Sequence, residues 1–183
     1  MHFDTPDAVY SYLDRYINFE RKVDPKSYRL DRMERLREMF GHPDRSYRVI
    51  HVAGSKGKGS TATMLASIAM RAEGPVGLYT SPHLLRFTER IAIDGFPVSD
   101  EILLASAEEL STVVEATGPA DFPGNESPTY FELLTMLAML CFRRAGCSIA
   151  VVEVGLGGRL DSTNVVEPVA SIITSIELEH TEL

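Results

Sequence analysis

The sequence has few features of disulfide-stabilised or nucleic-acid-binding proteins. It contains only two cysteines, Cys141 and Cys147, which cannot crosslink a chain of 183 residues and which lie in apolar surroundings. This cysteine usage favours the reducing cytoplasm. Lysine and arginine total 18 against 26 acidic residues, and the net charge of −8 argues against broad electrostatic attachment to nucleic acid or to an anionic membrane. A local anion site remains compatible with this charge.

Long hydrophobic segments and targeting signals are also scarce. The longest apolar stretch, Leu133 to Phe142, is well short of the roughly 20 residues that cross a bilayer. Residues 1–7 are acidic and lack the cationic and apolar regions of a secretory signal. We therefore expect no membrane span and no leader. With 44% hydrophobic residues the chain can bury a core, and its length suits one domain with a short extension.

Residues 1–47 are predicted to form a helical amino-terminal arm. Thr5 and Pro6 provide a cap and a first-turn proline for one helix, and a second helix is expected to end at Gly41. The interspersed charges of this arm are typical of a solvated amphipathic face, which we favour over a binding role. Apolar residues recur at helical spacing in both segments: Val9, Leu13 and Ile17, then Leu30, Met33, Leu36 and Phe40.

From residue 48 onward, short apolar runs alternate with glycine-containing loops and helical stretches. This alternation is typical of βαβ units and predicts an α/β fold with a doubly wound parallel sheet over residues 48–183. Asp94 and Gly95 predict a hairpin turn, and Thr129 with Glu132 has capping-box spacing. The expected strands cover 49–53, 76–79, 148–154 and 169–176, and the expected helices cover 60–73, 99–117 and the stretch after residue 129.

The residues after the first expected strand form the strongest candidate site, because ligands of parallel sheets bind beyond the carboxyl ends of the strands. Glycines there let backbone amides approach an anion, the helix beginning near Ser60 adds positive potential, and Lys58 can reach terminal phosphates. The spacing differs from the standard P-loop, since Gly59 follows the lysine where serine or threonine is usual. A glycine-rich turn with chance lysines is the alternative. The predicted phosphate-binding residues are Gly54, Ser55, Lys56, Gly57, Lys58, Gly59 and Ser60.

Glu153 is the second strong candidate, because it interrupts the apolar run 149–154 of a strand expected to be buried on both faces. An unpaired ionised carboxylate there would cost several kcal/mol, so it requires a cation, strong donors or a proton. A magnesium ion associated with ATP would supply that cation. Pairing with Arg159 is the structural alternative.

Three further segments are weak candidates on spacing alone. Ser81 lies in a proline-containing loop after the second strand, where a local serine cap is the simpler interpretation. The glycine-rich segment 155–164 either wraps a ligand or forms a structural turn. His180 follows the fourth strand, and a lone histidine at a strand end is usually a surface residue.

Taken together, these segments resemble the folylpolyglutamate synthase and dihydrofolate synthase family of Mur-type ligases. The resemblance is ordered along the chain and spans most of it. The segments that carry it are HVAGSKGKGS (51–60), YTSPHL (79–84), RFTERI (86–91), VEVGLGGRLDSTN (152–164), and TSI to HTE (174–182).

The resemblance implies a P-loop ATPase domain of the Mur ligase central-domain type and an ATP-dependent carboxylate:amine ligase. Such an enzyme adds L-glutamate to dihydropteroate or tetrahydrofolate through an acyl phosphate. The implied cofactors are ATP and Mg²⁺, and the implied partners are small molecules: folate or pteroate, glutamate and ATP. This chemistry depends on positioning and charge neutralisation more than on covalent catalysis.

The same resemblance assigns roles to residues of this sequence. Gly54 to Ser60 would hold the ATP phosphates, with Lys58 on the transferred group. Arg159 and Asp161 would arrange the substrate or the loop. The residues that would approach the metal, directly or through water, are Ser81, Glu153 and His180, and the catalytic residues would be Lys58, Glu153 and His180.

The sequence departs from the family pattern in its phosphate loop, near its end and in length. Ser55 and Lys56 replace a threonine and an asparagine, and Glu177 and Glu179 stand where glycine and aspartate are common. Family members continue for a few hundred residues, including a carboxy-terminal glutamate-binding domain that is absent here. We therefore expect an amino-terminal fragment with little or no ligase activity alone. The alternatives are another Mur-type ligase and a non-catalytic nucleotide-binding remnant.

Overall fold

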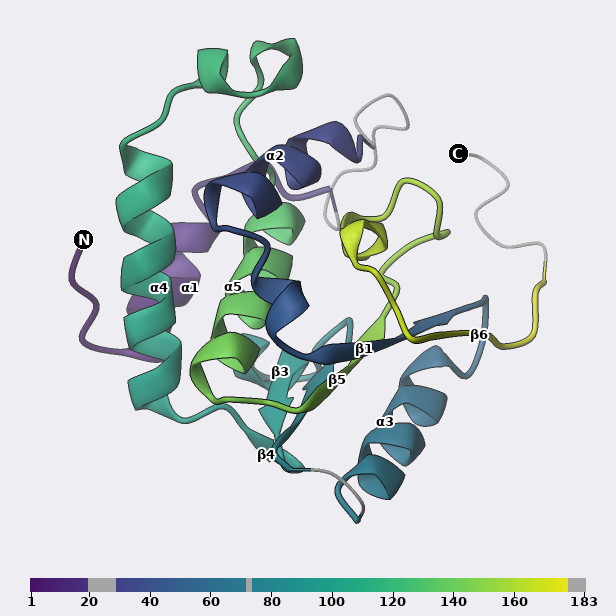
Figure 1. The fold of residues 1–183 in the computed structure, drawn as a ribbon. Coiled ribbons are helices and arrows are strands. Elements are labelled where there is room, and N and C mark those ends of the chain that lie inside the picture. Colours follow the sequence, from purple (N-terminus) through teal and green to yellow (C-terminus); the bar gives the residue numbers. More distant parts are fainter. Residues whose placement is uncertain (20–28, 72–73, 178–183) are drawn as a thin grey trace.

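A six-stranded sheet forms the centre of the computed structural model, which describes residues 1–19, 29–71 and 74–177 (Figure 1). The strand order is β4-β3-β2-β5-β1-β6. The strands β2, β5, β1 and β6 pair in parallel, whereas β3 and β4 extend the sheet beyond β2 in antiparallel orientation. This mostly parallel sheet confirms the predicted α/β class. The strands are β1 (Arg48–Ala53), β2 (Val76–Tyr79), β3 (Ile91–Ile93), β4 (Phe96–Pro97), β5 (Ile149–Glu153) and β6 (Ala170–Ile173).

The helices bury two apolar clusters of unequal size. The larger cluster joins α1, α2, α4 and α5 to the sheet, and the smaller one lies between the sheet and α3 (Figure 1). The helices are α1 (Pro6–Leu13), α2 (Asp31–Met39), α3 (Lys58–Ala69), α4 (Asp100–Glu115) and α5 (Tyr130–Arg144). Short 3₁₀ turns connect them: η2 (Pro43–Ser46), η3 (Phe87–Arg90), η4 (Pro119–Asp121), η5 (Pro123–Asn125) and η6 (Ser162–Val165).

The central helix α5 is buried at twelve of its fifteen positions. Its start is the predicted capping box: the Thr129 side chain accepts the N–H of Glu132, and the Glu132 side chain accepts the N–H of Thr129. Near its end, Phe142 packs so closely on β2 that a Cβ added to Gly77 would lie 2.6 Å from the phenyl ring. Glycine in this strand therefore lets the helix approach the sheet.

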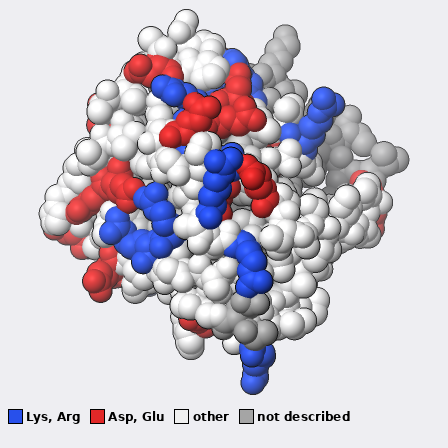
Figure 2. Space-filling model, viewed as in Figure 1, with Lys and Arg blue, Asp and Glu red and all other residues white. Residues whose placement is uncertain are grey.

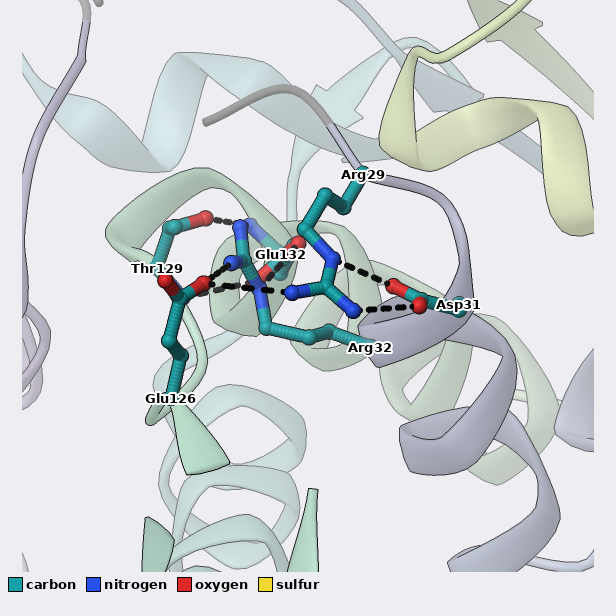
Figure 3. A network of polar contacts seen from close by, with 6 residues as sticks. All are labelled: Arg29, Asp31, Arg32, Glu126, Thr129 and Glu132. Atoms are coloured by element: carbon teal, nitrogen blue, oxygen red, sulfur yellow. Dashed lines mark hydrogen bonds and ion pairs between the residues drawn. The ribbon is translucent and has the colours of Figure 1, made fainter. Parts of the chain in front are cut away.

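The amino-terminal arm contains the two predicted helices, and most of its described charged residues are exposed or half-buried, as predicted. The Thr5 side chain caps α1 as expected, by accepting the N–H of Ala8 at 3.2 Å. In α2, however, Arg32 and Arg37 are buried, with 3% and 9% of each residue exposed. Figure 3 shows Arg32 between carboxylates contributed by other parts of the chain. Helical spacing does not reveal these inward charges, because Arg32 pairs with carboxylates about a hundred residues away and Arg37 pairs with Asp44 beyond the end of the helix.

The boundaries of several predicted elements differ by a few residues. Gly57 adopts a left-handed conformation with φ +78°, and α3 begins directly after it, two residues before the predicted start. The strand β6 ends at Ile173, three residues earlier than predicted, and Ser175 then forms an isolated antiparallel bridge with Lys56. The turn at 94–95 is confirmed between β3 and β4. Among the described residues, every helix is too short or too polar for a bilayer span.

Candidate functional site

Three of the predicted site residues meet at the carboxyl ends of β1, β2 and β5. Glu153 is the last residue of β5, and only 4% of it is exposed. Its Oε2 atom accepts the backbone N–H of Ser81 at 3.0 Å. The backbone N–H of Gly59 and the charge of Lys58 also act on this carboxylate, and both lower its pKa. The structure therefore brings Lys58, Ser81 and Glu153 to one edge of the sheet.

The surroundings of Glu153 act on its pKa in opposite directions. Burial raises the pKa most strongly, and the charge of Asp161 adds to this effect, whereas the Ser81 N–H and the Lys58 charge lower it. These largest influences do not include Arg159, whose side chain is exposed and whose carbonyl oxygen accepts Asn164 Nδ2 at 3.1 Å. The alternative in which Arg159 neutralises this carboxylate therefore has no geometric support among the described contacts.

The loop between β1 and α3 forms a glycine-lined cradle. Gly54 and Gly57 have φ values of +133° and +78°, which other residues rarely adopt. A Cβ added to Gly54 would lie 2.0 Å from the Thr174 hydroxyl oxygen, so glycine is required by a close approach as well. Lys58 folds back over the loop, where its Nζ donates to the Ser55 carbonyl oxygen at 3.2 Å. The free N–H groups at the start of α3 and the Lys58 ammonium together suit an anion.

The outer side of this loop is tied to the segment after β6. The Ser55 N–H donates to the Ser175 carbonyl oxygen at 2.8 Å. The Ser55 hydroxyl donates to the Glu177 carbonyl oxygen at 3.1 Å and accepts the Glu177 N–H at 3.0 Å. The Lys56 ammonium forms an ion pair with the Glu177 carboxylate. The remaining predicted site residue, His180, lies outside the described residues.

The loop between β2 and β3 is held by a carboxylate that sequence reasoning missed. Glu89 accepts the backbone N–H groups of Leu84, Leu85 and Arg86 at 2.8, 3.1 and 2.8 Å. These N–H groups lower the pKa of Glu89, because they favour its ionised form. The loop holds Leu84 and Leu85 outward, each 89% exposed. A glutamate at the third position of a short helical turn was the signal that could have identified this role.

Asp161 organises the glycine-rich segment after β5 from inside. Its Oδ2 atom accepts the Leu156 N–H at 2.8 Å, and its Oδ1 atom accepts the Thr163 N–H at 2.9 Å and the Thr163 hydroxyl at 2.5 Å. Because that hydroxyl proton is donated to Asp161, His51 Nε2, 2.8 Å from the same oxygen, is the donor. Burial raises the pKa of Asp161 and lowers that of His51. Asp161 is predicted to arrange either the substrate or the glycine-rich loop, and these contacts have the geometry for arranging the loop.

Oxygen donors at the strand ends could contribute to a metal site, although the described side chains do not complete one. Within residues 1–19, 29–71 and 74–177, no group of three or more His, Cys, Asp or Glu residues is arranged to hold a metal ion. The Glu153 carboxylate and the Ser81 oxygen atoms are hard donors that suit magnesium. Any metal held here would therefore require further ligands, such as nucleotide phosphates or water.

Comparison with known proteins finds strong similarity to enzymes of folate metabolism. No protein-family model matches the chain. The dihydrofolate synthase/folylpolyglutamate synthase of Bacillus subtilis (strain 168) is 42% identical over 152 residues, covering 82% of this chain and 35% of that protein. A Mycobacterium tuberculosis folylpolyglutamate synthase structure complexed with ADP has a TM-score of 0.83 and 36% identity, covering 97% of this chain and 38% of that one.

A structure described as an FPGS–AMPPCP–folate complex is similar to the same extent. It has a TM-score of 0.85 and 36% identity, and the match covers 98% of this chain and 42% of that chain. The likeness therefore extends over nearly all of this chain, which spans about two fifths of the length of the solved relatives.

Proposed function

This chain is a homologue of the dihydrofolate synthase/folylpolyglutamate synthase family over part of its members' length, and from that premise we propose that it holds the ATP phosphates in a glutamate ligase. The observation that carries the proposal is the meeting of Lys58, Ser81 and Glu153 beside the glycine-lined cradle. Relatives whose structures contain ADP, or AMPPCP with folate, support the nucleotide and the substrate class.

The reaction that we propose for the whole enzyme joins the carboxyl group of a pteroate or folate to the amino group of L-glutamate. A carboxylate oxygen attacks the terminal phosphorus of ATP, and ADP leaves with the electrons of the broken P–O bond. The glutamate nitrogen then attacks the carbonyl carbon of the acyl phosphate. Phosphate leaves and the nitrogen loses a proton, which yields the amide. Both steps require charged groups to be brought together with correct orientation.

In this proposal the cradle and Lys58 bind the negative charge of the polyphosphate. The segment from Gly54 to Ser60 surrounds the phosphates with the backbone N–H groups that the protein does not itself engage, and the Lys58 ammonium leaves the Ser55 carbonyl oxygen for the terminal phosphate. The Glu153 carboxylate orients the loop after β2 by accepting the N–H of Ser81.

The residues present fit a magnesium ion bound together with ATP. A buried carboxylate at Glu153 and oxygen atoms at Ser81 lie beside the cradle, and His180 is the third predicted ligand. When bound, magnesium supplies further positive charge to the phosphates. The raised pKa of Glu153 supports this assignment, because a nearby cation favours the ionised carboxylate that burial disfavours.

The surface and the cysteines support small-molecule chemistry in the cytoplasm. On the face shown in Figure 2, acidic and basic side chains alternate and form no single basic surface of the kind that binds nucleic acid. Both cysteines are free and buried, Cys141 and Cys147, which is consistent with a reducing compartment. We therefore infer a cytoplasmic enzyme whose ligands are nucleotide, folate or pteroate, and glutamate.

The first test of the proposed function is titration of the chain with ATP, with and without magnesium, by isothermal calorimetry. Lys58→Ala should weaken ATP binding by at least about tenfold, because a charge-assisted contact to phosphate is lost. Arg71→Ala is the matched control, since it removes an exposed cation just beyond the other end of α3 and should leave the affinity unchanged. Equal affinity of wild type and Lys58→Ala would contradict the assignment.

The second test concerns the substrate. ATP-dependent phosphate release is measured with dihydropteroate, folates and muramyl precursors, using the chain alone and a full-length relative as positive control. Release by the relative with pteroate or folate, together with ATP binding by this chain, is the expected result. Stimulation of this chain by muramyl precursors alone would contradict the proposed substrate class and favour another Mur-type ligase.

A further inference from the structure

The phosphate loop carries a cation that is already paired. Lys56 precedes Gly57 in the loop, and its ammonium contacts the carboxylate of Glu177. The backbone of Glu177 also contacts Ser55: its carbonyl oxygen accepts the Ser55 hydroxyl, and its N–H donates to the same hydroxyl oxygen. Both polar side chains between Gly54 and Gly57 are therefore engaged by Glu177.

The hydrogen bonds of Ser55 and the ion pair of Lys56 differ in how easily they break. The Ser55 N–H bonds the Ser175 carbonyl oxygen and the Ser55 hydroxyl bonds the backbone of Glu177, at 2.8 to 3.1 Å, and these hydrogen bonds fix the position of the loop. The ion pair lies in solvent, because 63% of the Lys56 side chain and 48% of the Glu177 side chain are exposed. Exposed ion pairs contribute little net stability, so this one can open without moving the backbone.

Carboxylate and phosphate oxygens are alternative partners for the same ammonium group. A polyphosphate bound in the cradle brings several negative charges next to Lys56, whereas Glu177 offers one. The carboxylate also lowers the electrostatic potential of the loop over a distance of about 8 Å at physiological salt. Both effects oppose the binding of a phosphate ligand until Lys56 exchanges partners.

We propose that Glu177 sets the nucleotide affinity of the phosphate loop by holding Lys56 until a polyphosphate displaces it. This inference rests on the proposed function, because it concerns the same cradle. Glu177 acts through Lys56 and is therefore a positioning residue, not a catalytic one. The ligand class is a nucleoside di- or triphosphate, and the probe for the experiment is ATP.

The ion pair can be removed without removing the backbone tie. Glu177→Gln keeps the main-chain N–H and carbonyl groups that contact Ser55 and changes only the charge of the side chain. Lys56→Gln removes the other partner. Glu101→Gln neutralises an exposed acid at the start of α4, away from the phosphate loop, and is the matched control for net charge (Figure 1).

The experiment is a double-mutant cycle of ATP affinity, measured by calorimetry on wild type, Glu177→Gln, Lys56→Gln and the double variant. We expect Glu177→Gln to tighten ATP binding by about two- to fivefold, the range expected for releasing an exposed ion pair. In the Lys56→Gln background the same change should give little or no gain, since no ammonium is released. Glu101→Gln should bind ATP like wild type.

Three results contradict the inference. Unchanged or weaker binding by Glu177→Gln overturns it while wild-type binding leaves the proposed function intact. A gain that persists without Lys56 shows long-range charge repulsion instead of exchange of partners, and also overturns it. Failure of wild type and of every variant to bind ATP contradicts the proposed function itself, and the inference fails with it. Circular dichroism of each variant establishes that it is folded.

Discussion

Arg32 is a fully enclosed cation whose neutralisation depends on carboxylates about a hundred residues away. Its Nε lies 3.2 and 3.3 Å from the two carboxylate oxygens of Glu132, and its Nη1 donates to Glu126 Oε2 at 2.5 Å (Figure 3). Side-chain exposure is 3% for both Arg32 and Glu132. Because Glu132 also caps α5 through Thr129, this charge pair joins the arm to the first turn of the central helix.

We predict that Arg32→Met lowers the free energy of unfolding by about 3–5 kcal/mol, because it leaves the buried Glu132 carboxylate without its cation. Arg35→Met is the matched control. Arg35 lies on the same helix, its side chain is 45% exposed, and its ion pair with Glu38 is worth less than about 1 kcal/mol. Urea unfolding followed by circular dichroism measures both values. If the two variants lost similar amounts of unfolding free energy, the buried ion pair would contribute no more to stability than the exposed one.

At the scale of elements, the sequence predicts best where the signal is local. The capping box at Thr129 and the turn at 94–95 depend on neighbouring residues, and both are confirmed. The sequence predicts the start of α3 two residues late, because glycines flank Lys58 and glycine disfavours helix interiors. Here the loop geometry overrides that preference.

In the candidate site, too, the sequence predicts some residues and misses the contacts between distant segments. The positions after β1 and β5 follow from parallel-sheet topology, so Lys58 and Glu153 could be identified from the sequence. The contacts of Glu177 with Ser55 and Lys56 span about 120 residues and have no sequence spacing to reveal them. The resemblance to a family identified segments of this site, but not which of their backbone groups touch.

The loop between β2 and β3 offers a test of one carboxylate as an organiser. Glu89→Gln should speed hydrogen exchange of the Leu84, Leu85 and Arg86 amides by several-fold, because a neutral amide is a weaker acceptor than a carboxylate. Amide exchange measured by NMR or mass spectrometry gives the rates. Glu101→Gln should leave them unchanged. Equal protection in Glu89→Gln would mean that other contacts hold this loop.

At the scale of the whole molecule, carboxyl groups with opposite pKa shifts determine the response to acid. Backbone N–H groups lower the pKa of Glu89 and Glu108 from the ordinary value of 4.5, and hydrogen bonds from arginines lower that of Glu167. Each binds fewer protons in the folded state, so its stabilisation is present above the ordinary pKa and is lost as the pH falls through the lowered one. Burial raises the pKa of Glu132 and Asp161, which favours folding as the pH falls toward their ordinary values.

We therefore predict that the free energy of unfolding falls as the pH drops below 4.5, where the carboxylates with lowered pKa values begin to be protonated. Urea unfolding at a series of pH values measures this curve. Glu108→Gln should flatten the acid side, since it removes a carboxylate that receives the Phe3 N–H and contacts His2. An acid side that is as steep in Glu108→Gln as in wild type would contradict the contribution of this carboxylate.

The position of β1 between β5 and β6 has a consequence for how the chain assembles during its synthesis. Arg48 pairs in register with Ile149, and Ile50 with Ala170, so neither neighbour of β1 exists until about a hundred further residues have left the ribosome. The cradle that follows β1 waits longer still, because residues 174–177 brace it. Such long-range pairing is slow and exposes unpaired strand edges in the nascent chain. The proposed phosphate site is thus completed only after residues 174–177 have been synthesised.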